Sequence, residues 1–218
     1  MSCSSLYVID KNYYGSNIAD FKNSWLFSPI IWNVLSEKYL PTKYGLVQSV
    51  IGLDGNEVWI KINRTMNNSG NTCERICWEL TNQRIFFSKD KKCIAQNILE
   101  FINTHKGYSK SKEDGISALE REHIIERFTE IADSIMGIDE AEYPYFVLKN
   151  SSCDDEVERW FRKYDNEADE YQSRSLKDFP EVVTNFVVIE NNKIKEFIMN
   201  VEYPYEDVME DANGRKNN

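Results

Sequence analysis

Carboxylate side chains are concentrated between Asp154 and Glu170, where eight of the seventeen residues are acidic. Such a stretch could serve acid–base catalysis, hold a metal ion or attract a basic partner. The acids at its start have a structural explanation, because carboxylates in the first turn of a helix interact favourably with the helix dipole. The six residues from Asp165 to Glu170, four of which are acids, have no such explanation.

A calcium loop is the most specific chemistry that this acidic run suggests. Asp165, Glu167 and Asp169 have the alternating spacing with which such a loop begins. However, its sixth position is Glu170 instead of glycine, and its twelfth is Leu176 instead of glutamate. The calcium loop is therefore rejected, and nothing in the spacing fixes a geometry for paired-carboxylate catalysis.

The remaining residues with reactive side chains form no recognisable site. Glu120 and His123 have the Glu-x-x-His spacing of di-iron bundles, but a second copy is missing, since residue 102, three before His105, is isoleucine. No phosphate-binding, dinucleotide-binding, nucleophile-elbow or zinc-protease motif occurs. The odd number of cysteines is typical of free thiols: Cys3, Cys73, Cys77, Cys93 and Cys153. We therefore expect no catalytic residues, no metal and no cofactor.

Charge is divided unequally along the chain. Residues 1–112 carry 14 basic and 9 acidic residues, a balance of +5, whereas the rest carries 12 and 27, a balance of −15. An acidic surface repels phosphate backbones and attracts basic proteins. Together with the absence of a long apolar run, this predicts a cytoplasmic protein that binds neither nucleic acid nor membrane.

The first half is predicted to begin with a strand, a helix and a hairpin. A strand is predicted at 5–10 and a helix from Ser28 to Pro41, with Pro29 at a position that suits a first helical turn. Asp54-Gly55 then predicts a hairpin of strands near 44–53 and 56–63.

A second hairpin is predicted from "ERICWEL" and "RIFFS", with its turn at Thr81–Gln83, so that four antiparallel strands form a meander. A helix follows from Asp90 to the glycine at 107.

The second half is predicted to alternate helices and strands. A polar hinge at 107–115 precedes a helix at 116–136 and a strand at 144–149. A further helix starts at Ser152 or Asp154 and includes Val157, Trp160, Phe161 and Tyr164 at helical spacing.

The chain ends in a hairpin that turns at Asn191-Asn192, followed by a polar tail at 206–218. The fold class is therefore α+β: an antiparallel meander sheet with three to four helices and a C-terminal β-hairpin. Residues 1–205 are expected to form one domain, with a possible subdomain boundary at 107–115.

The interpretation that suits these features is a binding protein without enzymatic activity. An acidic chain rich in tyrosine is similar in build and charge to bacterial immunity proteins, which neutralise a cognate toxin. The expected partner is a basic protein, such as a nuclease-type toxin domain, whose cleft the acids would occlude. The candidate contacts are Asp165, Glu167, Asp169, Glu170 and Tyr171, with Tyr143 and Tyr145. An enzyme without a recognisable motif and a subunit of a larger assembly remain as alternatives.

Overall fold

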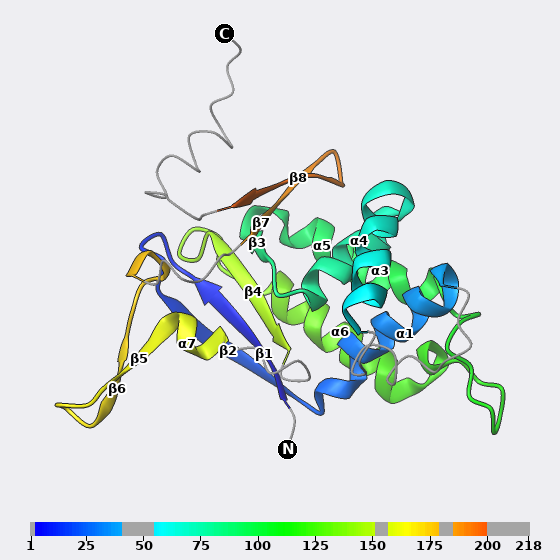
Figure 1. The fold of residues 1–218 in the computed structure, drawn as a ribbon, viewed down its shortest axis with the longest axis horizontal. Helices are drawn as coiled ribbons and strands as arrows, with labels where there is room; N and C mark the ends of the chain where they lie inside the picture. The colour runs from blue at the N-terminus through cyan, green and yellow to red at the C-terminus, as the bar shows by residue number, and fades with distance from the viewer. Residues whose placement is uncertain (1–2, 41–54, 151–156, 179–184, 200–218) are drawn as a thin grey trace, which may run out of the picture.

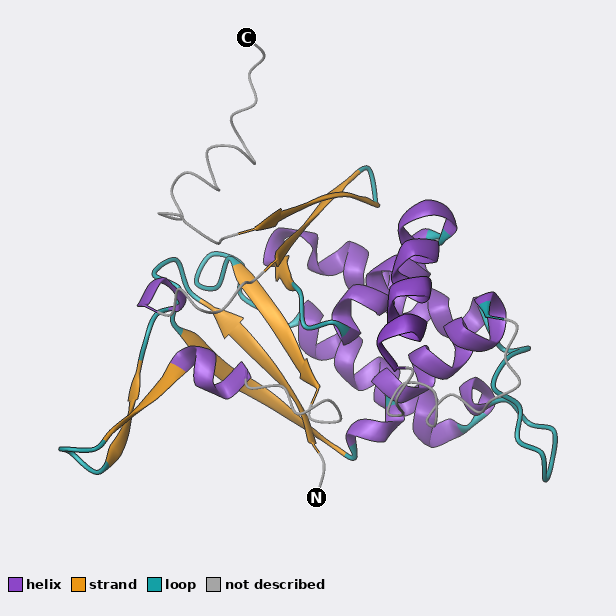
Figure 2. Cartoon of the chain, viewed as in Figure 1, coloured by secondary structure: helices purple, strands orange, loops and turns teal. Residues whose placement is uncertain are grey.

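The structure is a computed structural model that describes residues 3–40, 55–150, 157–178 and 185–199. A six-stranded sheet divides it into two unequal sides (Figure 1). Five helices pack on one side, whereas the other side carries one short helix and a small two-stranded hairpin (Figure 2). The described part of the chain is thus a mixed α/β structure with a mostly antiparallel sheet.

The main sheet has the strand order β2-β1-β4-β3-β7-β8. All neighbouring strands are antiparallel except β3 and β7, which are parallel. The strands are β1 Cys3–Ile9, β2 Gly15–Lys22, β3 Ile85–Phe87, β4 Tyr145–Asn150, β7 Asn185–Glu190 and β8 Lys193–Met199. The separate hairpin consists of β5 Arg162–Asp165 and β6 Glu170–Ser173.

The described residues contain six α-helices: α1 Ser28–Tyr39, α3 Gly55–Ser69, α4 Thr72–Thr81, α5 Lys91–Thr104, α6 Glu122–Met136 and α7 Val157–Phe161. Local sequence explains several of their ends. Pro29 occupies the first turn of α1, and Asn71 forms a capping box with Glu74 at the start of α4. None of the helices in the described ranges is both long and apolar enough to cross a lipid bilayer.

Apolar side chains cover both faces of the central strands. In β1, Leu6 and Val8 pack toward the helices in the larger core, whereas Tyr7 and Ile9 pack on the opposite face in a second, smaller core. The same alternation occurs in β4, β3 and β7, as the two-residue period of a strand requires. Both faces must therefore be shielded from water, and this explains why α7 lies across from the helical layer.

A buried carboxylate joins three helices inside the larger core. Glu74 of α4 and His105, which caps α5, are both fully buried. One carboxylate oxygen of Glu74 lies 2.6 Å from His105 Nε2 and accepts from Lys38 Nζ of α1 at 2.5 Å. The other oxygen accepts from the Tyr39 hydroxyl at 2.7 Å and from the Asn71 amide at 3.0 Å. The carboxylate thus links α1, α4 and the end of α5.

Both ring nitrogens of His105 face hydrogen-bond acceptors. Its Nδ1 lies 2.9 Å from the Phe101 carbonyl oxygen, and its Nε2 faces the Glu74 carboxylate. Both neighbours are acceptors, so each contact is a hydrogen bond only when that ring nitrogen carries a proton. Burial alone would raise the pKa of Glu74, but hydrogen bonds from His105, Lys38 and Tyr39 outweigh it and lower this pKa to about 2.

The predicted meander was wrong. Residues 56–63 lie in α3 instead of a strand, and "ERICWEL" lies in α4. In α4 the buried residues Cys73, Ile76, Cys77 and Leu80 recur at helical spacing, and the capping box fixes the start of the helix. In α3, Ile62 and Met66 are buried four residues apart, so helical packing overrides the strand preference of the β-branched residues. The predicted strand at 44–53 lies outside the described residues.

Other predicted elements were confirmed. Strands at 5–10 and 144–149, the helix from Ser28 and the helix after Asp90 all appear within a few residues of the predicted bounds. The C-terminal hairpin turns at Asn191 and Asn192, whose φ angles are 50° and 59°, in the left-handed region that asparagine tolerates. The tail at 206–218 lies outside the described residues.

Two predictions about the second half need correction, and a third stays a prediction. The helix expected from residue 116 begins at Glu122, after a short 3-10 turn at Ala118–Glu120. The helix expected to include Tyr164 ends at Phe161, where the chain enters β5. The possible subdomain boundary at 107–115 stays a prediction; these residues connect α5 and α6, which pack against each other with the ring centroids of Phe101 and Phe128 6.3 Å apart.

Replacing Glu74 with glutamine should destabilise the fold at neutral pH by about 3 kcal/mol, because it removes the counter-ion of Lys38 and the charged acceptor of the surrounding hydrogen-bond donors. The folded-state pKa of Glu74 lies below its unfolded value. Its stabilisation is therefore fully present above about pH 4.5 and is lost as the pH falls toward 2.

The free energy of unfolding of the wild type and of E74Q, measured with urea at neutral pH and at pH ~3, checks this pH dependence. The gap between them should narrow in acid, and the control E126Q, at an exposed position of α6, should unfold like the wild type at both pH values. An E74Q variant as stable as the wild type at neutral pH would contradict the role of this network.

Candidate functional site

A two-stranded hairpin extends from the sheet side that lacks the large helices (Figure 1). We call residues Arg162–Ser173 the arm; it comprises β5, the turn and β6. Apart from Asp165, which is half-buried, every residue of the arm is exposed. Five of the seven predicted contact residues lie on it: Asp165, Glu167, Asp169, Glu170 and Tyr171.

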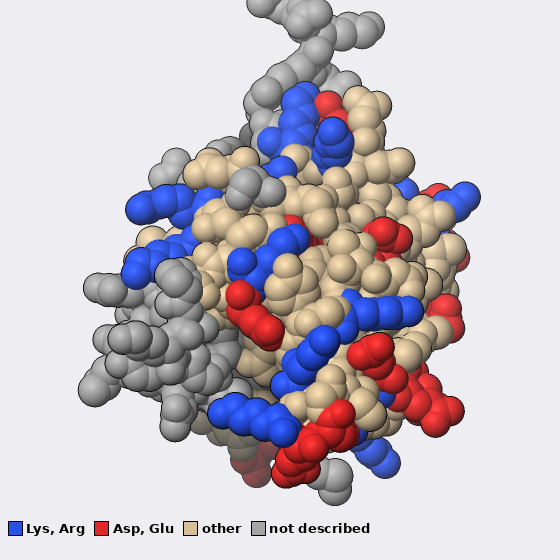
Figure 3. All heavy atoms as spheres, turned by 90° about the vertical axis from the view of Figure 1, so that its right-hand side faces the viewer, with Lys and Arg blue, Asp and Glu red and all other residues tan. Residues whose placement is uncertain are grey.

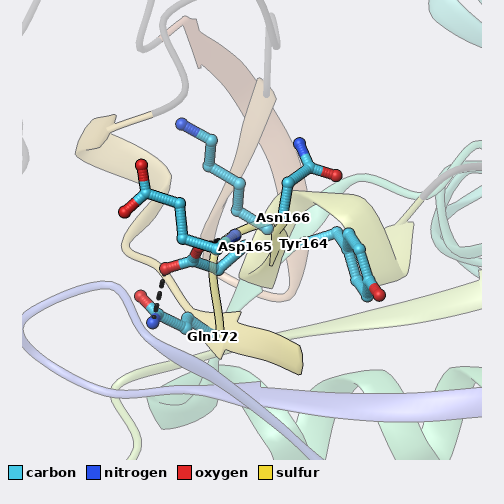
Figure 4. Close-up of a pocket in the computed structure, with 6 residues that line it drawn as sticks. Tyr164, Asp165, Asn166 and Gln172 are labelled. Atoms are coloured by element: carbon cyan, nitrogen blue, oxygen red, sulfur yellow. Dashed lines mark hydrogen bonds between the residues drawn. The ribbon is translucent and has the colours of Figure 1, made fainter. Parts of the chain in front are cut away.

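The turn of the arm is built by its own acids. One carboxylate oxygen of Asp165 accepts hydrogen bonds from the backbone amides of Glu167 at 2.9 Å and Ala168 at 3.2 Å. Its other oxygen accepts from the Gln172 side chain at 2.9 Å (Figure 4). Asp169 then closes the turn with a φ of 54°. Asp165 therefore acts as a turn-forming residue, a common role for aspartate.

Cross-strand pairing sorts the arm into two faces. Tyr164 lies opposite Tyr171, and their rings meet edge to face with centroids 5.0 Å apart. The alternate face carries Asp165 opposite Glu170 and Lys163 opposite Gln172, because paired residues of antiparallel strands share a face. One face thus carries the two tyrosines together with Arg162 and Ser173, and the other carries two acids, a lysine and a glutamine.

The face with the two tyrosines is open to solvent. Tyr171 is 68% exposed and Tyr164 is 40% exposed, although tyrosine usually hides part of its ring. The Tyr164 hydroxyl donates a hydrogen bond to the Asp169 carboxylate, and this bond raises the pKa of Tyr164. Tyr171 therefore presents the larger free apolar surface.

The four acids of the arm divide into two pairs. Asp165 and Asp169 accept hydrogen bonds within the arm. By contrast, neither Glu167 nor Glu170 has a side-chain hydrogen bond or ion pair with any residue that the structure describes. Glu167 borders a shallow pocket together with Lys163, Tyr164, Asp165, Asn166 and Gln172 (Figure 4). The carboxylates free to meet a partner are thus those of Glu167 and Glu170.

The two remaining predicted contacts lie elsewhere. Tyr145 belongs to β4 and is buried, with its hydroxyl 3.1 Å from that of Tyr13. Its side chain is therefore not available to a partner, because strand alternation turns it into the second core. Tyr143 precedes β4, is half-buried and packs against the helix-side core. Neither residue joins the arm.

Other residues with reactive side chains lack the surroundings of an active site. Glu74 and His105 have no exposed surface, so a substrate could not reach them. Burial raises the pKa of the Cys73 thiol to about 11 and that of Cys77 well above its ordinary value, so both thiols stay protonated. Within the described ranges, His, Cys, Asp and Glu form no group of three able to hold a metal ion.

The helical side differs from the arm in its charge pattern. Lysine, arginine, aspartate and glutamate side chains are interspersed over that surface (Figure 3). A surface of mixed sign gives no strong field of one sign, whereas the tip of the arm carries four acids within six residues. The arm is therefore the more distinctive candidate for recognition.

Comparisons with protein-family models, curated proteins and solved structures give no match for this chain. The assignment of a site accordingly depends on the geometry of the arm.

Replacing Asp165 with alanine should loosen the arm without unfolding the protein. The variant removes three hydrogen bonds at the turn, and a net loss of about 1 kcal/mol matters in a hairpin of two strands, which is only marginally stable alone.

Proton NMR checks this through the contacts between the Tyr164 and Tyr171 rings, which should weaken in D165A. The control E167A changes an acid of the same turn whose side chain makes no bond within the arm, so it should preserve them. Equal ring contacts in D165A and the wild type would show that Asp165 does not build the turn.

Proposed function

We propose that this protein is a stoichiometric binding protein that neutralises a basic protein partner through the arm. The partner we favour is a nuclease-type toxin domain, whose positively charged substrate cleft the arm would occupy. The observation that carries the proposal is an exposed arm that combines an uncovered aromatic side chain, Tyr171, with the uncommitted carboxylates of Glu167 and Glu170.

The arm supplies both elements of a protein-binding surface. Exposed tyrosines are typical anchors, because they bury a large apolar area and lose few rotatable bonds. The carboxylates add charge complementarity, which speeds encounter with a basic surface and sets orientation. A cleft that binds phosphate groups is lined by basic residues, so an acidic arm suits it.

The geometry favours occlusion as the mechanism of inhibition. A narrow two-stranded arm can enter a groove that a broad surface could not. The two faces of the arm would then contact opposite walls of the groove. Because Asp165 and Asp169 are engaged in hydrogen bonds of the arm itself, they would hold its shape while Glu167 and Glu170 meet the cations of the partner.

The experiment begins with capture of partners from the source cells by the tagged chain at low salt, identified by mass spectrometry. We expect one dominant basic protein, recovered in equal amount and released at high salt. Inhibition of its activity at a one-to-one ratio would support neutralisation. A basic protein whose activity is unaffected by a saturating amount of the chain would contradict it.

Charge reversal then tests the arm itself. The double variant E167K/E170K should slow association with the captured protein about tenfold at low salt and flatten the salt dependence of the rate. The matched control E126K/E140K makes the same change in net charge at exposed positions outside the arm, and it should change the rate far less. If both double variants slow association equally, the net charge of the protein steers the partner, and the acids of the arm have no special role.

Tyr171 is expected to act on dissociation. Replacing it with alanine should speed dissociation by about tenfold or more, since central aromatic anchors contribute about 2 kcal/mol when truncated. Surface plasmon resonance separates this effect from the association rate. An unchanged dissociation rate would show that the face with the two tyrosines does not touch the partner.

A further inference from the structure

The helix that carries the arm is too short to be stable alone. α7 has five residues, whereas isolated helices need about 12 to 15 residues even in favourable sequences. Its position must therefore come from contacts with the rest of the protein. Those contacts also decide the direction in which the arm points, because β5 starts at the residue after α7.

The main contact is the ring of Phe161, the last residue of α7. It is only 2% exposed and stacks on Tyr7 of β1, with ring centroids 5.6 Å apart. It also covers Gly15, the first residue of β2. A Cβ atom at residue 15 would lie 2.4 to 2.6 Å from the ring carbons of Phe161, which is closer than carbon atoms can approach. The ring therefore occupies space that only glycine leaves free.

The other end of the arm is attached to the same region. Leu176, which is buried, donates its backbone amide to the Tyr13 carbonyl at 3.0 Å. The Ser175 hydroxyl donates to the Asn12 carbonyl at 2.7 Å. A hydrogen bond of 2.9 Å from the Arg174 amide to the Phe161 carbonyl closes the base of the arm. Both ends of the arm thus meet at the turn between β1 and β2.

The turn between β1 and β2, to which the arm is attached, is held in place by its own hydrogen bonds and by packing. The Asp10 carboxylate accepts hydrogen bonds from the backbone amides of Asn12 at 2.8 Å and Tyr14 at 2.9 Å. Tyr13 is buried with a φ of 68°, and its ring stacks on Tyr145 at 5.4 Å. The turn between β1 and β2 is therefore packed into the second core through Tyr13.

We infer that Gly15 is a positioning residue for the arm: by leaving room for Phe161, it fixes α7 and the direction of the arm before any partner arrives. The consequence for binding deepens the proposed function and rests on it. A fixed arm binds more tightly than a loose one, because less conformational freedom is lost on association. We therefore expect a residue of the main sheet, outside the arm, to control the affinity of the arm.

The test is the variant G15A, with G107A as its matched control, because a Cβ at residue 107 would meet no atom within 4 Å. Amide hydrogen exchange of the free protein is measured at Arg174 and Leu176, whose amides bond to Phe161 and Tyr13. We expect exchange at least about tenfold faster in G15A, as local opening becomes easier, and unchanged exchange in α5 and α6. Trypsin should also cut faster at Arg162 and Lys163.

The variant F161A, which lacks the ring, shows whether G15A acts by displacing the ring or by some other effect of the alanine at residue 15. The three atoms nearest to a Cβ at residue 15 all belong to this ring, so G15A/F161A should exchange like F161A alone. Exchange at Arg174 and Leu176 that is equal in G15A and G107A would overturn the inference. So would a further acceleration from G15A in the F161A background.

Affinity for the basic protein captured from the source cells tests the consequence separately. We expect G15A to bind about tenfold more weakly than G107A. One outcome is that G15A loosens the arm but keeps the affinity, whereas E167K/E170K weakens binding. In that case the link between positioning and affinity is overturned and the proposed function stands. If neither G15A nor E167K/E170K changes binding, the arm is not the interface, and the proposed function itself is contradicted.

Discussion

The central strands carry apolar side chains on both faces, and this constraint shapes the rest of the structure. The helices satisfy it on one side by packing as a layer. On the other side the cover is thin: Tyr13, Phe161 and Leu176 pack with the aromatic and aliphatic side chains of β1, β4, β3 and β7. Because Phe161 and Leu176 lie on either side of the arm in sequence, covering this face also anchors both ends of the arm. The candidate binding surface is thus a consequence of how the second core is closed.

The carboxylates of the interior and of the arm differ in how many hydrogen-bond partners they have. Inside, Glu74 has four hydrogen-bond donors, so the buried carboxylate is fully satisfied and holds three helices together. On the arm, two acids shape the turn and two have no partner within the described residues. Satisfied buried charge supports the fold, whereas unsatisfied exposed charge is available to another molecule. This contrast is why we assign a structural role to the Glu74–His105 network and propose a binding role for the arm.

The sequence predicted the elements whose signals are local. Asn191-Asn192 identified a hairpin because asparagine tolerates left-handed backbone, and Pro29 marked the start of α1. It failed at residues 56–80, where alternating β-branched residues suggested strands, although helical burial of Ile62, Met66, Ile76 and Leu80 decides the outcome. The acidic run was found, but not its shape. Asp165-Asn166 was a turn signal that could have revealed the hairpin. The role of Gly15 was not predictable, because it depends on a ring 146 residues later in the chain.

The most direct test of the central claim is a map of amide hydrogen exchange in the free chain and in its complex with the captured basic protein. If the arm is the binding surface, protection on binding should be strongest at residues 162–173 and weak over α5 and α6. Protection centred on the helical layer, with the arm exchanging as fast as in the free chain, would contradict the account.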